Sequence, residues 1–202
     1  MIEAQRGAYV ALSAGLVPVS MTNNLLQPRR CPRCGIAEDL DFVDPELRLP
    51  AGMTTVDELD QECEVERDAD IAYTEDGRLI VSARLDALAS GDPGWRTIPM
   101  PSQPGCYLLA IERTVRVDPA DSPAAHGQPC YVCGRAPEYT YGKHDIHLVG
   151  ADPEPSGWYR TDASYRSLDQ HPLTLVARSR FDELQRLGVR GMDINGVVTF
   201  LS

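Results

Sequence analysis

The sequence predicts an α+β fold in which two related strand–helix–strand halves are joined by a shared four-cysteine zinc-knuckle site, with many loops. Three observations lead to this prediction. A Cys-x-x-Cys-Gly motif occurs twice, a strand–helix pattern recurs, and the 202 residues include 16 glycines and 16 prolines. Because glycine and proline mark turns, the strands should be short and irregularly connected.

The two motifs are Cys31-Pro32-Arg33-Cys34-Gly35 and Cys130-Tyr131-Val132-Cys133-Gly134. Each can form a turn around a metal ion, with backbone N–H groups directed at the thiolates and a glycine of positive φ at its end. Four thiolates complete the tetrahedral shell of a structural zinc ion and leave no position for a reacting water. We therefore expect one zinc per chain, with these ligands: Cys31, Cys34, Cys130 and Cys133.

The gap between the motifs is much longer than the roughly 15–20 residues of an ordinary zinc ribbon. Two separate thiol pairs, each a redox centre or a local disulfide, are the alternative. Cys31-Pro32-Arg33-Cys34 also resembles a glutaredoxin-type active site, but residues 27–30 and Gly35 do not supply the strand and helix that such a site needs. Cys63 and Cys106 lie outside both motifs, and we expect them to be core or surface thiols.

A similarity within the chain favours one shared site. Residues 79–95 resemble residues 175–192, and four residues recur at matching positions. The matched pairs are Arg84 and Arg180, Asp86 and Asp182, Leu88 and Leu184, and Gly94 and Gly191. Two halves packed about a pseudo-twofold axis would each contribute one knuckle, which explains the long gap. Chance similarity between two short amphipathic helices is the alternative.

The domain boundaries follow from this division. We expect an N-terminal segment over 1–30, a first half with the acidic segment over 31–118, and a second half over 119–202, with the halves packed as one unit. In the first half, residues 57–73 favour a helix and then a strand, Asp76-Gly77 a turn, and 79–81 a buried strand. Ser82 is the expected N-cap of a helix over 83–90.

Alternation of apolar and polar residues predicts one half-buried strand over 107–117 and another over 138–149. Residues 151–165 have the composition of a loop. A buried strand is expected over 173–176, and a helix over 180–187 that turns Phe181, Leu184 and Leu187 inward. Asn195-Gly196 between apolar residues predicts a hairpin turn.

Charge is unevenly distributed along the chain. Residues 38–76 carry 15 acidic and two basic residues, in a chain of net charge −11. Because phosphate backbones attract clustered Lys and Arg, nucleic acid is not an expected ligand, and no apolar run is long enough to span a membrane. We interpret the segment as a docking face for a basic protein; a solvated surface is the alternative. The candidate partner-binding residues are Asp57, Glu58, Asp60, Glu62, Glu64 and Glu66.

No catalytic pattern emerges from the sequence. It contains no Gly-x-Ser-x-Gly elbow, no glycine-rich phosphate loop and no His-Glu-x-x-His helix. His144 and His147 have metal-like spacing, but three residues along a strand put two side chains on opposite faces. We therefore predict a protein that is not an enzyme.

The motif pair, the block 129–135 and the closing segment 181–191 together resemble the double-CXXCG motif family, a paralogous set best known from myxobacteria. The resemblance implies a cytoplasmic immunity protein that binds and neutralises a cognate contact-delivered toxin of the swarming-inhibition type. It also marks Cys31, Cys34, Cys130 and Cys133 as the motif positions. A zinc-ribbon adaptor in another assembly and, less favoured, a CxxC thiol-disulfide oxidoreductase are the alternative functions.

Overall fold

The computed structural model describes residues 5–16, 20–22, 31–34, 46–48, 69–74, 77–118, 120, 122, 125–133, 138–139, 145–149, 154, 156–165 and 171–201. In this part of the chain there are two helices, α1 (Ala83–Ala89) and α2 (Arg178–Arg186). The first seven strands are β1 (Gln5–Leu16), β2 (Ser20–Thr22), β3 (Glu46–Arg48), β4 (Ile71–Tyr73), β5 (Leu79–Ser82), β6 (Thr97–Pro99) and β7 (Cys106–Leu109). The others are β8 (Thr114–Val117), β9 (Ala125–His126), β10 (Glu138–Tyr139), β11 (Ile146–Val149), β12 (Trp158–Tyr165), β13 (His171–Ala177) and β14 (Met192–Leu201).

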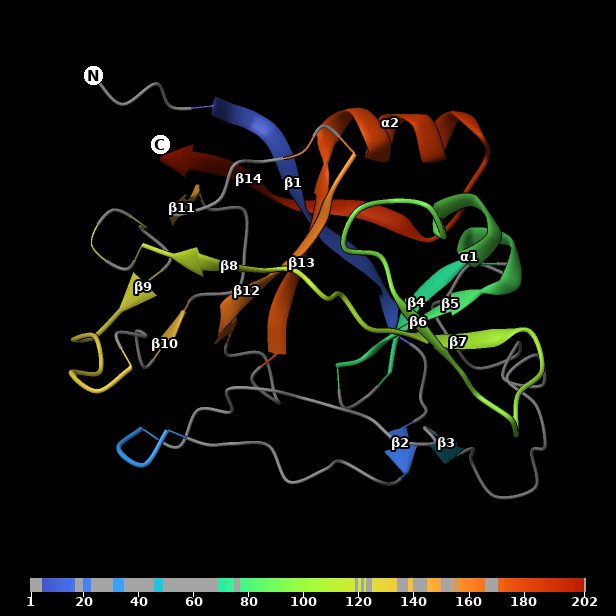
Figure 1. Cartoon of the computed structure of the whole chain (residues 1–202), viewed down its shortest axis with the longest axis horizontal. Coiled ribbons are helices and arrows are strands. Elements are labelled where there is room, and N and C mark those ends of the chain that lie inside the picture. The colour runs from blue at the N-terminus through green and yellow to red at the C-terminus, as the bar shows by residue number, and fades with distance from the viewer. Residues whose placement is uncertain are drawn as a thin grey trace.

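Six strands form a closed barrel in the order β13-β12-β8-β11-β14-β1, and β1 pairs back onto β13 to complete the ring (Figure 1). The predicted fold class is therefore wrong: the protein is mostly β, not an α+β arrangement of strand–helix–strand halves. The prediction failed because strands from both chain ends join this barrel. β1 lies in the N-terminal segment, which was placed outside the two halves, and β12 lies in residues that were expected to form a loop.

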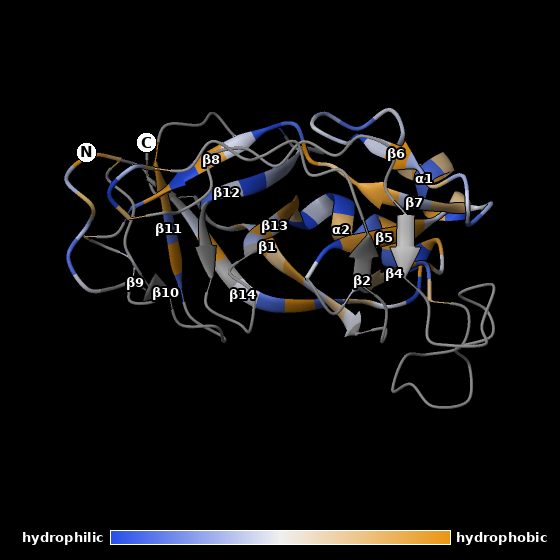
Figure 2. Cartoon of the chain, turned by 90° about the horizontal axis from the view of Figure 1, so that it is seen from below, coloured by the Kyte–Doolittle hydropathy of each residue, from blue (hydrophilic) through white to orange (hydrophobic). Residues whose placement is uncertain are grey.

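A second sheet extends from the barrel. β4 pairs in parallel with β1, and the strands then follow in the order β4-β5-β7-β6. Alternate residues of β1 consequently face two different cores. Tyr9 and Ala11 belong to the core inside the barrel, whereas Val10 and Leu12 belong to the core beneath the helices and the second sheet. Figure 2 shows the matching alternation of apolar and polar residues along β14.

The two helices lie close to their predicted positions. The Ser82 hydroxyl accepts a hydrogen bond from the Leu85 N–H at 3.1 Å, which confirms the predicted N-cap of α1. Phe181 and Leu184 are buried as expected. Leu187 is not, because α2 ends at Arg186 and leaves the Leu187 side chain 47% exposed just before Gly188 turns the chain at φ 77°.

Two other strand predictions were wrong in extent. The alternating run over 107–117 is divided between β7 in the second sheet and β8 in the barrel, and residues 138–149 contain the separate strands β10 and β11. Asn195-Gly196 does not form a hairpin turn. β14 continues through it, and Ala11 pairs with Gly196 while Leu12 pairs with Ile194. Asn195 is thus the extra residue of a β-bulge, which accommodates it without reversing the strand.

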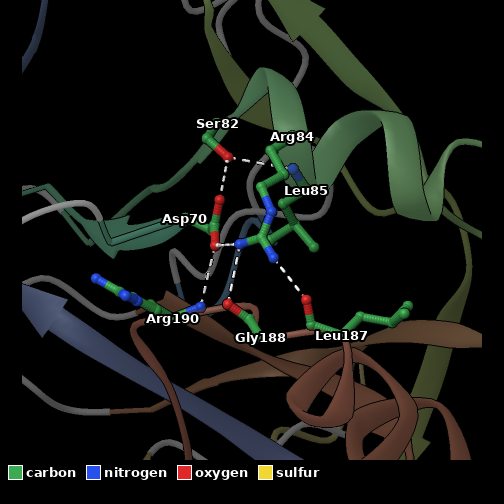
Figure 3. A network of polar contacts seen from close by, with 7 residues as sticks. All are labelled: Asp70, Ser82, Arg84, Leu85, Leu187, Gly188 and Arg190. Atoms are coloured by element: carbon green, nitrogen blue, oxygen red, sulfur yellow. Dashed lines mark hydrogen bonds and ion pairs between the residues drawn. The ribbon is translucent and has the colours of Figure 1, made fainter.

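Asp70 organises the junction between α1 and the end of α2 (Figure 3). Its buried carboxylate accepts hydrogen bonds from the Ser82 hydroxyl at 2.7 Å and from the Arg190 backbone N–H at 3.0 Å. Arg84 forms an ion pair with the same carboxylate at 2.7 Å. The Arg84 guanidinium also donates to the carbonyls of Leu187 and Gly188, which follow α2. These contacts fasten the two helices to each other.

A second arginine makes the opposite connection. Arg180 of α2 donates to the Leu88 carbonyl of α1 and forms an ion pair with Asp92 at 2.7 Å. Both side chains of this pair are nearly buried, at 10% and 12% exposure. The Trp158 indole N–H donates to the same Asp92 oxygen, so the ion pair also anchors the first residue of β12.

Candidate metal centre

The two cysteine motifs form turns outside the barrel. Residues 32–34 and 131–133 have turn conformation, and Figure 1 shows both segments at the lower left. Neither motif contributes to the two hydrophobic cores of the described residues. The site is therefore built by two turns that approach each other at the periphery of the fold.

The four motif sulfurs converge. The Sγ atoms of Cys31, Cys34, Cys130 and Cys133 all lie within 4.8 Å of one another. Two contacts between the motifs join Cys31 to Cys130 at 3.8 Å and Cys34 to Cys133 at 3.6 Å. A zinc ion with Zn–S bonds of about 2.3 Å requires sulfurs about 3.8 Å apart in a tetrahedron. The observed spacing fits one metal ion held by both motifs. It argues against the alternative of two separate thiol pairs.

The local electrostatics favour thiolates. In the first motif, the backbone N–H groups of Cys34 and Arg33 lower the pKa of Cys31 to about 6, against the opposing effect of burial. In the second motif, the N–H groups of Cys133 and Val132 lower the pKa of Cys130. Both turns thus direct backbone donors at their first sulfur, as expected for a metal-binding knuckle. A lowered thiol pKa reduces the competition between protons and a metal ion.

The residues between the cysteines form an exposed surface. Pro32 and Arg33 are exposed, and so are Tyr131 and Val132, at 82% and 52%. The Arg33 guanidinium lies 5.6 Å from the centre of the Tyr131 ring, which is cation–π distance. This contact was not predicted from the sequence. Its signal was available, because two knuckles around one ion bring their intervening residues together.

The other candidate residues are placed as follows. The acidic set from Asp57 to Glu66 and Cys63 lie outside the described residues, and so does His144. Cys106 begins β7 and is half-buried. His147 lies on β11, outside the sulfur cluster. Within the described ranges, the four motif cysteines are the one group of three or more His, Cys, Asp and Glu residues arranged to hold a metal ion.

Comparisons with protein-family models, with characterised proteins and with solved structures gave no match. The chemistry of the site therefore follows from its own geometry. Neither helix in the described part of the chain is long and apolar enough to cross a membrane.

Proposed function

We propose that this protein is a zinc-stapled binding protein that neutralises a cognate toxin in the cytoplasm, and that it is not an enzyme. The observation that carries the zinc assignment is the convergence of four sulfurs from two motifs 99 residues apart within 4.8 Å. Four soft thiolates in a tetrahedral arrangement suit zinc among the common divalent ions. With all four positions taken by protein, the ion holds the two turns together and does not activate water.

The inhibitory role is supported by the sequence resemblance to the double-CXXCG motif family. A binding function is also consistent with the surface between the cysteines. Tyrosine and arginine are enriched among the residues that dominate protein–protein binding energy, and Tyr131 and Arg33 are exposed and in contact with each other. The adaptor alternative predicts binding through the same surface to a different class of partner.

The metal assignment is tested on the purified full-length chain. Elemental analysis should give one zinc per chain, and Cys31→Ser and Cys133→Ser should each lower the zinc content. Cys106→Ser is the matched control, because that cysteine lies outside the cluster, and it should retain the metal. A chain that contains no metal, or two ions, contradicts the shared site.

The inhibitory role is tested by co-purification with the product of the neighbouring gene and by survival of cells that express both proteins. Complex formation together with rescue of the cells supports the proposal. The absence of both a complex and rescue contradicts it. Changing the acidic set Asp57, Glu58, Asp60, Glu62, Glu64 and Glu66 to amides should slow association severalfold at low salt, because complementary charge acts mainly on the association rate. Unchanged kinetics would assign this segment to solvated surface.

A further inference from the structure

We propose that the four cysteines are a peroxide-sensitive modification site, in which oxidation joins Cys31 to Cys130 and Cys34 to Cys133. Disulfides between the motifs then take over the connection that the metal provides. This inference rests on the proposed metal centre, but it concerns the thiols themselves and is tested on metal-free protein.

The pairing follows from the sulfur contacts. Four thiols allow three sets of two disulfides: within the motifs, directly across them, or diagonally. The contacts at 3.8 Å and 3.6 Å match each cysteine with the cysteine at the same position of the other motif. A disulfide needs its sulfurs at about 2.05 Å, so both direct pairs must close by less than about 2 Å. The direct set can form while both turns keep their positions.

Exposure indicates which sulfur reacts first. Cys31 is buried, whereas Cys34, Cys130 and Cys133 are partly exposed. A hydroperoxide therefore reaches Cys130 more readily than Cys31. The Cys31 sulfur, 3.8 Å from that of Cys130, is then in position to resolve the oxidised sulfur. In the other pair, both cysteines are accessible and either can react first.

The chemistry balances with hydrogen peroxide as the oxidant. A thiolate attacks one peroxide oxygen, the O–O bond breaks, and a sulfenic acid and hydroxide form. The facing thiolate then attacks the sulfenic sulfur, forms the S–S bond and displaces a second hydroxide. Each disulfide thus transfers two electrons from sulfur to one peroxide, and two protons convert the hydroxides to water. Where zinc is bound, it leaves as Zn²⁺ when its thiolates are consumed.

The outcome differs from that of a CxxC redox motif. Disulfides within each motif would close two short loops and would leave the motifs unconnected. The direct disulfides instead close a loop between positions 99 residues apart. Oxidation then preserves the junction of the two turns, together with the contact between Arg33 and Tyr131, after the metal is lost.

The sequence allows all three pairings to be distinguished by digestion. Trypsin cuts after Arg30 and Arg33, which separates Cys31 from Cys34, and chymotrypsin cuts after Tyr131, which separates Cys130 from Cys133. Full-length protein is freed of metal and reductant, treated with two equivalents of hydrogen peroxide, alkylated and digested without reduction. Mass spectrometry should find the peptide 31–33 linked to the one that ends at Tyr131, and the peptide that begins at Cys34 linked to 132–135. A majority of within-motif or diagonal links would overturn the proposal.

Paired variants provide a matched kinetic test in a background of Cys63→Ser and Cys106→Ser. Cys31→Ser with Cys130→Ser keeps one direct pair, and Cys31→Ser with Cys133→Ser keeps one diagonal pair. The direct pair should form its disulfide at least about tenfold faster, and equal rates would overturn the assignment. Absence of zinc from the native protein would contradict the proposed metal centre. The comparison of disulfide rates would still test the pairing, because it is made on metal-free protein.

Discussion

Arg84 and Arg180 each donate hydrogen bonds to the carbonyls at the end of the other's helix. Arg84 of α1 reaches Leu187 and Gly188 after α2, and Arg180 of α2 reaches Leu88 in the last turn of α1. Cations at a helix C-terminus satisfy free carbonyls and interact favourably with the helix dipole. Each arginine also binds an aspartate, Asp70 or Asp92. The pair thus couples the two helices through reciprocal contacts.

The first prediction concerns the strength of this coupling. Arg180→Gln should lower the free energy of unfolding by about 3–5 kcal/mol, because it leaves the nearly buried Asp92 without its cation. Urea denaturation at constant metal loading measures the change. Arg178→Gln is the control, since Arg178 pairs with Asp182 where both side chains are 50% exposed, and it should cost less than about 0.5 kcal/mol. Similar losses in the two variants would contradict the importance of the buried pair.

The second prediction separates steric conflict from backbone conformation. Gly94 has φ 84°, and a Cβ there would lie 2.2 Å from the Trp158 carbonyl oxygen. Gly105 has φ 89° with nothing within 4 Å. Gly105→Ala should therefore cost about 1–2 kcal/mol for conformation alone, whereas Gly94→Ala should cost at least about 3 kcal/mol. Equal midpoints in thermal unfolding would show that the strand at Trp158 moves aside freely.

The third prediction concerns alkaline pH. Burial, followed by the neighbouring Tyr159, raises the pKa of Tyr9 above its ordinary value. Tyr9 keeps its proton in the folded barrel, where its hydroxyl donates to the Glu154 carbonyl. A raised pKa contributes stability that is complete below the unfolded value near 10 and is lost as the pH rises above it. The free energy of unfolding should fall by about 1.4 kcal/mol per pH unit from this group alone.

Urea denaturation between about pH 9 and 11, on either side of the ordinary tyrosine pKa, measures that slope. Tyr9→Phe should be less stable at neutral pH, because it lacks the hydrogen bond, but its stability should decline less steeply in the alkaline range. In the ultraviolet titration of Tyr9→Phe, the tyrosinate absorbance should also lack the step of the tyrosine that ionises at the highest pH. An unchanged slope in Tyr9→Phe would show that Tyr9 already ionises in the folded protein.

The fourth prediction concerns metal removal. The cysteine turns lie outside both hydrophobic cores of the described chain, so chelation should leave the barrel folded. Trp95 and Trp158 report on the second core, where their ring centres are 4.7 Å apart. Their fluorescence should stay constant on chelation, while hydrogen exchange should increase in the cysteine turns. Loss of the tryptophan signal together with the metal would contradict this separation.

The parts of the structure that could be predicted are those with local signals. Convergence of the cysteines followed from residue type and spacing, the start of α1 from the Ser82 cap, and both helices from their apolar stripes. Barrel closure has no local signal, because β1 pairs with strands near the other end of the chain. β1 is buried on both faces. A strand that contacts two cores lacks the alternation of apolar and polar residues by which a half-buried strand is predicted. The Asn195-Gly196 pattern predicts a hairpin turn, but β14 forms a bulge there.

The pairing of β1 with β13 and β14 has a consequence for synthesis. β1 is made first, while its barrel partners lie between His171 and Leu201, close to the other end of the sequence. At the usual rate of roughly 5–20 residues per second, the ribosome needs about ten seconds or more to make the chain. During that time β1 has no barrel partner, so the ring closes only after β13 and β14 have been synthesised. A ribosome stalled before residue 171 therefore carries a chain in which β1 lacks both of its neighbours in the barrel.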